Sequence, residues 1–217
     1  MSADWPTDIR EARGIQIALA AKVRCIPLAS PIRLIAGVDA SFSGDGVFAA
    51  ACLYDFPSLD RVEEAVAFRP LTFPYVPGFL SFREGPVVLD VLAALGRKPD
   101  ILLIDGQGIA HPRGLGLASH IGVLLGLPAI GCAKSRLIGN FREPGHARGC
   151  RSQLTFNGQT VGAVVRTRTG VRPLFVSPGH LVEIPGSVRF VLRAAPRFRI
   201  PEPLRRADAL SRAASKS

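Results

Sequence analysis

Three acidic residues stand at points in the sequence where their carboxylates could share a divalent metal ion. Asp39 follows the apolar run LIAGV, Asp105 closes the apolar run ILLI, and Glu84 lies between them in SFREGP. Both apolar runs have the length and composition of buried strands, so the two aspartates are expected at strand ends that can meet at one end of a sheet. Carboxylate oxygens are the ligands that hard divalent cations prefer, and an ion held in this way promotes hydrolysis of phosphodiesters. The pattern therefore predicts a metal-assisted hydrolytic site.

Each of these acids, taken singly, also fits a structural role. Asp39 could be a solvated acid at a strand end, Glu84 an acid in the first turn of a helix, and Asp105 the start of an Asp-Gly turn. The combination favours a metal, because unpaired acids at the ends of apolar strands are costly unless something compensates their charge.

Two further side chains could assist such a reaction. Lys134 follows an apolar run in GCAKS, where its ammonium could contact a phosphate oxygen or the attacking water. His180 follows Ser-Pro-Gly at the end of a short strand, where an imidazole could orient the water or move a proton. A surface lysine and an exposed loop histidine are the structural alternatives. No GxxxxGK precedes Ser135, and no nucleotide cofactor is indicated.

An aromatic residue lies between two prolines in the string FPYVPG. The prolines restrict the backbone and are expected to hold the Tyr75 ring outward, where it could stack on bases or wedge between them. A tyrosine buried in a turn is the structural alternative.

The first third of the chain predicts a helix followed by an antiparallel meander. Apolar residues at helical spacing predict the helix over residues 6–23. Three strands are expected next, over residues 33–41, 47–56 and 62–70, because the turn strings SGDG and FPSLD separate them.

The rest of the chain alternates between helices and strands before a basic end. Helices and strands are expected in turn at residues 85–96, 101–105, 114–126 and 128–133, then two strands at 161–168 and 174–177 and a helix at 181–194. Residues 197–217 carry several arginines and two early prolines and are expected to form a basic, partly flexible arm. The predicted fold is α/β, with a mixed central sheet of three antiparallel strands and then parallel strands, flanked by helices.

The composition favours one domain and a polyanionic partner. The 217 residues are expected to form a single domain over 1–217, and 27 Lys and Arg against 17 acidic residues favour nucleic acid as the partner. The four cysteines form no CxxC pair, so neither a structural zinc site nor disulfides are expected. No export leader is expected, because the first residues mix acids with bases and lack an apolar core, and the longest apolar stretch is shorter than the roughly 20 residues that span a bilayer. We expect a soluble, cytoplasmic protein.

Several strings, in this order, resemble those of the endonuclease V family, whose members act on inosine, the product of adenine deamination, in nucleic acid. They are GVDAS, PYVPGFLSFRE, DGQGIAHPRGLGLASHIGVLLGLPAIGCAKSRL and LFVSPGH. The resemblance runs from about Ile35 to His180. It implies a ribonuclease H-like fold, Mg²⁺ as the cofactor with Mn²⁺ as a substitute, and DNA containing deoxyinosine as the partner.

The resemblance also implies roles for individual residues. The family residues that match Asp39, Glu84 and Asp105 hold the catalytic metal, and the one that matches His180 belongs to the active site. Tyr75 matches the residue that separates the strands. The pocket for the flipped base is matched by Gly78, Leu80, Gly106, Gly108, His111 and Leu137. A pocket built mostly from backbone groups could recognise hypoxanthine, because a carbonyl and a ring N–H replace adenine's amino group and bare ring nitrogen.

The expected reaction is Mg²⁺-dependent cleavage of a phosphodiester on the 3′ side of inosine, leaving a 3′-hydroxyl and a 5′-phosphate, by a monomer that acts in DNA repair. Two alternatives stay open. One is a ribonuclease H-like nuclease for inosine-containing RNA or branched DNA, although the PYVPG string argues against a branched-DNA enzyme. The other is a nucleic-acid-binding protein without catalysis, against which the three acids argue.

Overall fold

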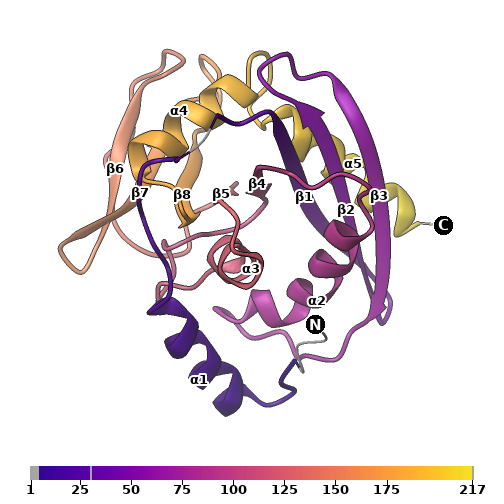
Figure 1. The fold of residues 1–217 in the computed structure, drawn as a ribbon. Coiled ribbons are helices and arrows are strands. Elements are labelled where there is room, and N and C mark those ends of the chain that lie inside the picture. Colours follow the sequence, from indigo (N-terminus) through magenta and orange to yellow (C-terminus); the bar gives the residue numbers. More distant parts are fainter. Residues whose placement is uncertain (1–4, 30, 217) are drawn as a thin grey trace.

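The computed structural model describes residues 5–29 and 31–216. In this part of the chain eight strands form one mixed sheet, in the order β3-β2-β1-β4-β5-β8-β7-β6 (Figure 1). As predicted, β1 (Leu34–Ser43), β2 (Gly46–Asp55) and β3 (Arg61–Pro70) form an antiparallel meander. Next to β1 lie the short parallel strands β4 (Ile101–Ile104) and β5 (Ala129–Ala133).

The other edge of the sheet is antiparallel and includes a strand that the sequence did not predict. β8 (Leu174–His180) pairs antiparallel with β5, and β7 (Gln159–Val165) and β6 (Arg151–Phe156) extend the sheet beyond it. β6 escaped prediction because Leu154 is its only fully buried side chain. An edge strand of this kind lacks a regular apolar alternation.

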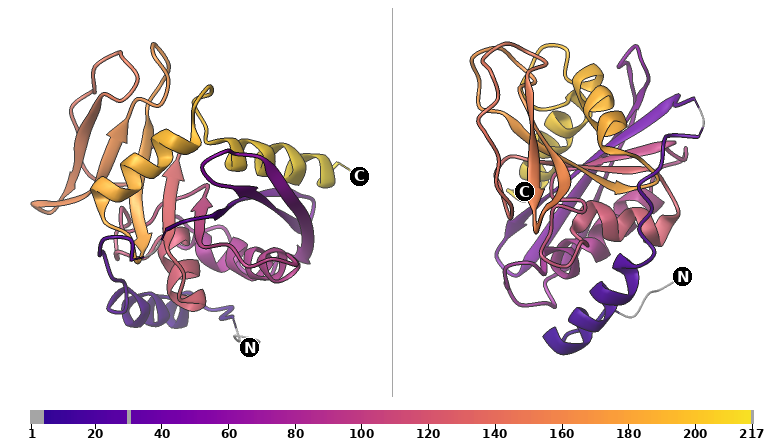
Figure 2. Two further views of the ribbon diagram at one scale, coloured as in Figure 1. Left: turned by 45° about the horizontal axis from the view of Figure 1, so that its top comes forward. Right: turned by 90° about the vertical axis from the view of Figure 1, so that its left-hand side faces the viewer.

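Helices cover both faces of the sheet (Figure 2). α2 (Leu80–Ala93) and α3 (Leu117–Leu125) pack on one face, with α1 (Ile9–Ala20) beside α3. α4 (Ile184–Ala194) and α5 (Glu202–Ala214) pack on the other face.

Alternation along β1 assigns its side chains to these two layers. Ala36 and Val38 belong to the core beneath α2 and α3, whereas Ile35 belongs to the core beneath α4 and α5. Gly37 therefore faces α5, and a Cβ placed on it would lie 2.2 Å from the carbonyl carbon of Pro203. Only glycine permits so close an approach of the helix to the strand.

The prediction of a partly flexible arm was wrong for residues 202–214, because they form helix α5. Its buried residues include Leu204, Ala207 and Ser211, which share one helical face. Two arginines separate Leu204 from Ala207 in the sequence and obscure the apolar stripe. One of them, Arg206, makes a bidentate ion pair with Glu64 of β3.

α2 begins at Leu80, five residues before the predicted start at residue 85. Gly85 and Pro86 lie inside the helix and weaken the helical pattern at that point. Glu84 is consequently the fifth residue of α2, and it projects from a regular helix.

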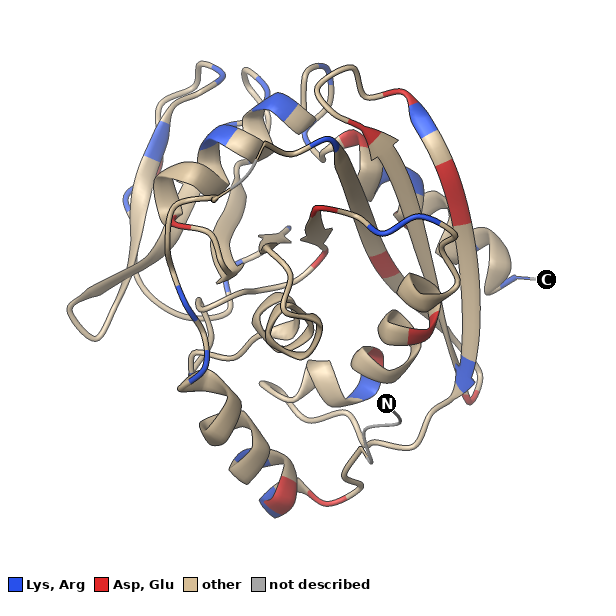
Figure 3. Ribbon diagram, viewed as in Figure 1, with Lys and Arg blue, Asp and Glu red and all other residues tan. Residues whose placement is uncertain are grey.

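No helix in the described ranges is long and apolar enough to cross a membrane. In the view of Figure 3, Lys and Arg lie on helices, strands and loops, and they alternate with acidic residues along β3. In this view the net positive charge is thus spread over many elements.

Candidate active site

Two of the predicted acids meet because their strands are parallel neighbours. Val38 of β1 is paired with Ile104 of β4, so Asp39 and Asp105 follow at the same end of the sheet. Asp105 also donates its backbone N–H to the Val38 carbonyl, at 3.1 Å. Strand alternation turns both side chains toward the α5 layer, since Ile35 and Leu103 already face it.

A third aspartate, which sequence reasoning missed, completes this cluster. Ligand oxygens of Asp39, Asp105 and Asp208 lie within 4.8 Å of one another. Asp208 comes from α5, one turn after the buried Leu204. The helical spacing of Leu204, Ala207 and Ser211 was the one sequence signal that could have placed this acid beside the sheet.

Glu84 approaches the same place from the opposite layer. Its side chain, on α2, is only 7% exposed, and it lines one groove together with Asp39, Asp105 and Asp208. The three predicted acids therefore converge, and Asp208 joins them as a fourth.

The crowded carboxylates disfavour their own ionisation. Burial and the neighbouring charge of Asp105 raise the pKa of Asp39 to about 8. Burial and the charges of Asp39 and Asp105 raise the pKa of Glu84 well above its ordinary value. A divalent cation would relieve both effects, because it supplies the positive charge that these oxygens lack.

Lys134 supplies part of this charge. It follows the end of β5 on the same face, and its Nζ lies 2.5 Å from Asp105 Oδ2 and 3.0 Å from Asp208 Oδ1. Burial lowers the pKa of this ammonium, but the bonds to the two aspartates outweigh burial and the pKa is raised. Although burial acts in the opposite sense, Lys134 and Arg212 hold the pKa of Asp208 below its usual value.

His180 does not belong to this cluster, contrary to the sequence-based expectation. Because β8 runs antiparallel to β5, His180 pairs with Ala129 at the start of β5, whereas Lys134 follows its end. Ala129 and Lys134 are five positions apart along an extended strand, which is roughly 16 Å. The imidazole is 6% exposed, and its Nδ1 accepts a hydrogen bond from the Arg24 backbone N–H at 3.3 Å. It lies at the far end of the sheet from the acidic cluster.

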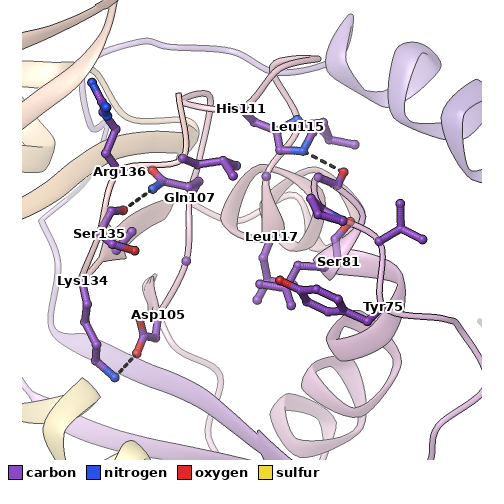
Figure 4. A pocket seen from close by; sticks show the side chains of 18 residues that line it. Tyr75, Ser81, Asp105, Gln107, His111, Leu115, Leu117, Lys134, Ser135 and Arg136 are labelled. Carbon is purple, nitrogen blue, oxygen red and sulfur yellow. Dashed lines mark hydrogen bonds and ion pairs between the residues drawn. The ribbon is translucent and has the colours of Figure 1, made fainter. Parts of the chain in front are cut away.

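A pocket of about 420 Å³ adjoins the acidic cluster (Figure 4). Lys134, Ser135 and Arg136 lie on one side of it, and Tyr75 and Ser81 lie on the other. The predicted pocket residues that line it are Gly78, Leu80, Gly106, His111 and Leu137, and Tyr75, which was predicted to separate the strands, lines it as well. Sequence reasoning missed other lining residues, among them Gln107, Leu115 and Leu117.

Gly108 was also predicted to line the pocket, but it lies behind the lining residues. Its N–H donates to Ser177 Oγ at 2.8 Å, and a Cβ on it would lie 2.0 Å from the Pro178 carbonyl oxygen. Its glycine character serves the packing of this loop against β8.

Backbone N–H groups border the pocket at the start of α2. Leu80 and Ser81 open this helix and line the pocket, and no side chain caps the helix. The first N–H groups of a helix have no acceptor within the helix, so they are available to a ligand carbonyl. Beside them, where His111 Nε2 bonds the Gly78 carbonyl, burial lowers the pKa of His111 to about 4, so its imidazole is neutral near pH 7.

The arrangement matches a known family of proteins. The sequence model of the family described as Endonuclease V matches residues 17–209. The chain belongs to the endonuclease V family. Endonuclease V of Roseiflexus sp. (strain RS-1) is 51% identical to it over 207 residues, which are 95% of this chain and 93% of that protein.

Solved endonuclease V structures share the fold. The crystal structure from Streptomyces avermitilis is 44% identical, with a TM-score of 0.94, and the match covers 100% of this chain and 96% of that one. Endonuclease V of Ciona intestinalis was solved in complex with a 24mer DNA containing an inosine followed by a ribo-adenosine. It is 28% identical with a TM-score of 0.83, over 96% of this chain and 98% of that one. The predicted family and the ribonuclease H-like fold are confirmed, and the protein is a nuclease.

Proposed function

We propose that this protein recognises deoxyinosine in DNA and hydrolyses a phosphodiester bond on its 3′ side in a Mg²⁺-dependent reaction. The observation that carries the proposal is that the pocket and the acidic groove share two residues, Asp105 and Lys134. A base held in the pocket would thus place its own backbone phosphates beside the carboxylates. Complexes of a relative with inosine-containing DNA support the same substrate for this chain.

The donor set fits a hard divalent cation. Asp39, Asp105 and Asp208 would hold it, with Glu84 close enough to serve directly or through water. The raised pKa values of Asp39 and Glu84 support this assignment, because acids that resist ionisation when alone need a compensating charge. The bound Mg²⁺ would supply a deprotonated water and neutralise charge on the phosphoryl oxygens.

Lys134 would contribute a second positive charge to the reaction. Its ammonium lies between two aspartates in this structure, within reach of the place that a phosphate would take. There it can donate hydrogen bonds to a non-bridging oxygen and stabilise the negative charge of the transition state. The product ends would be a 3′-hydroxyl and a 5′-phosphate.

Recognition of the base would rest on backbone groups. The N–H groups that open α2 can donate to the carbonyl of hypoxanthine, whereas adenine presents a donating amino group at that position. A buried donor without a partner costs roughly 1 to 3 kcal/mol, so two such contacts are enough for useful discrimination. The Tyr75 ring is 73% exposed at the pocket rim, where it can wedge into the gap that the extruded base leaves.

Cleavage of matched oligonucleotides tests the proposal. Duplex DNA with one inosine or one adenine at the same position, and the RNA counterparts, are incubated with Mg²⁺ or with EDTA. We expect cutting of the inosine DNA alone, only with Mg²⁺, on the 3′ side of the lesion, with a 5′-phosphate that a ligase accepts. Asp105→Asn, which removes one negative charge from the cluster, is expected to abolish cutting while leaving the fold intact.

Equal rates on adenine and inosine would remove the lesion-specific function, and full activity in EDTA would remove the metal. We assign the reaction to the repair of deaminated DNA, because cleavage beside the lesion opens the strand for its replacement.

A further inference from the structure

One backbone carbonyl beside the pocket accepts three hydrogen bonds. The oxygen of Gly78 lies 2.9 Å from Gln16 Nε2, 2.9 Å from His111 Nε2 and 2.7 Å from Arg113 Nη2. The His111 Nδ1 accepts the Arg113 backbone N–H at 3.2 Å, so its Nε2 carries the proton and donates. This oxygen has two lone pairs and receives three donors, so the three hydrogen bonds hold the Gly78–Phe79 peptide in one orientation.

The turn that carries this carbonyl connects the pocket to α2, the helix that carries Glu84. Phe79 donates its N–H to the Val76 carbonyl at 3.0 Å, and Gly78 has a φ of +80°. With Pro77 before it, this is the pattern of a type II turn, which needs glycine at its third position. Tyr75 precedes the turn, and α2 begins two residues after Gly78.

Of the two donors that do not line the pocket, Gln16 and Arg113, Gln16 comes from a separate helix. It lies on α1 and is completely buried, at 0% exposure. Its Oε1 accepts a hydrogen bond from Arg113 Nε while its Nε2 donates to Gly78. Both ends of the amide are therefore used. Burial of an amide is costly and an apolar residue would suffice for packing, so this position serves a specific polar contact.

Arg113 depends on the same amide. Its guanidinium lies over the Phe79 ring, 4.3 Å from the centroid, and burial together with the charge of Arg13 lowers its pKa. Gln16 Oε1 accepts a hydrogen bond from this guanidinium, and Gln16 Nε2 donates to the Gly78 carbonyl. The amide of Gln16 therefore connects Arg113 to the turn.

We propose that Gln16 is a positioning residue for base recognition, acting through the Gly78 carbonyl. This inference rests on the proposed function, since it assigns the residue that holds the wall of the inosine pocket. By fixing the Gly78–Phe79 peptide from behind, Gln16 keeps the first N–H groups of α2 and the Tyr75 ring in the geometry that receives the base. It touches neither the base nor the metal.

The test compares three variants with the wild type. Gln16→Met keeps the length of the side chain and removes both hydrogen bonds, and Gln16→Glu keeps the acceptor for Arg113 but removes the donor to Gly78. Ile17→Ala is the control, because this neighbour on α1 is 60% exposed. Steady-state rates are measured on inosine and adenine DNA, and hydrogen exchange is followed over residues 76–82.

We expect Gln16→Met to raise KM for inosine DNA about tenfold with little change in kcat, because a misplaced pocket weakens binding of the base and leaves the chemical step alone. Discrimination against adenine falls by the same factor, Gln16→Glu shows a similar loss, and Ile17→Ala behaves as wild type. Exchange over residues 76–82 becomes faster in both Gln16 variants.

An unchanged inosine-to-adenine ratio in Gln16→Met would overturn the inference, because an equal loss on both substrates would indicate a purely structural role. This outcome leaves the proposed function standing. That function fails separately, if the wild type itself does not prefer inosine.

Discussion

Lys134 Nζ lies 3.0 Å from Asp208 Oδ1, although 74 residues separate them in the sequence. The lysine follows the central strand β5, and the aspartate belongs to the last helix. Their contact closes the acidic cluster from the side of α5, so that the cluster exists only when this helix has docked on the sheet.

Substitution of the newly found aspartate tests its part in the site. We expect Asp208→Asn to lower the rate of cleavage roughly 100-fold and to raise the Mg²⁺ concentration needed for half-maximal activity, because one of the ligand oxygens loses its charge. Asp45→Asn, in the exposed turn between β1 and β2, is the matched control. Equal Mg²⁺ requirements in both variants would show that Asp208 does not hold the metal.

The raised pKa of Asp39 predicts how stability depends on pH without metal. The folded-state pKa of about 8 exceeds the ordinary value of 3.8, so the stabilising contribution of the protonated form is complete below about pH 4 and is lost as pH rises through 8. The Tm in EDTA is therefore expected to fall between pH 6 and pH 8.5, and Asp39→Asn should flatten this fall.

Mg²⁺ should raise the Tm more at pH 8 than at pH 6, because ion binding at the lower pH must first displace a proton. Thermal melts at both pH values, with and without Mg²⁺, measure the difference. A larger Mg²⁺ effect at pH 6 would contradict the assignment of the metal to these carboxylates.

Two substitutions by side chains of similar length distinguish the roles of His180 and Lys134, which the sequence analysis proposed for catalysis. His180→Gln is expected to retain cleavage within about threefold and to lower the Tm, because the imidazole bonds the Arg24 backbone far from the cluster. Lys134→Met is expected to lower kcat by roughly 100-fold, since a charge beside the reacting phosphate is lost. A reversed order of these two effects would restore the catalytic role of His180.

The close crossing of α5 over β1 at Gly37 offers a test at a distance from the chemistry. Gly37→Ala would place a Cβ 2.2 Å from the Pro203 backbone, so α5 must shift, at a cost of about 1 to 3 kcal/mol in the free energy of unfolding. Asp208 moves with the helix, and activity should fall even at temperatures where the variant is folded. Gly14→Ala, at a helical position of α1 with open space around it, is expected to stabilise by roughly 0.5 to 1 kcal/mol. Denaturant unfolding and cleavage rates measure both.

Local patterns in the sequence were enough to predict much of the site. The apolar runs before Asp39 and Asp105 identify buried strands, and parallel pairing then brings the two acids to one end of the sheet. The string PYVPG predicted an outward Tyr75, which is 73% exposed, because the two prolines restrict the backbone locally. Such features depend on residues within a few positions of one another.

The remaining features depend on contacts between distant segments. The register of β8 against β5 moved His180 to the far end of the sheet, and no pattern within LFVSPGH reveals that strand's direction. Asp208 joins the acids only because α5 packs on β1. Gln16 reaches the Gly78 turn only because α1 lies beside it. The sequence by itself determined seven of the eight strands in the described residues, the family motifs and three of the acids. Tertiary structure decided the fourth acid, the place of His180 and the support behind the pocket, because helix docking and strand register are set by the packing of whole surfaces rather than by local propensity.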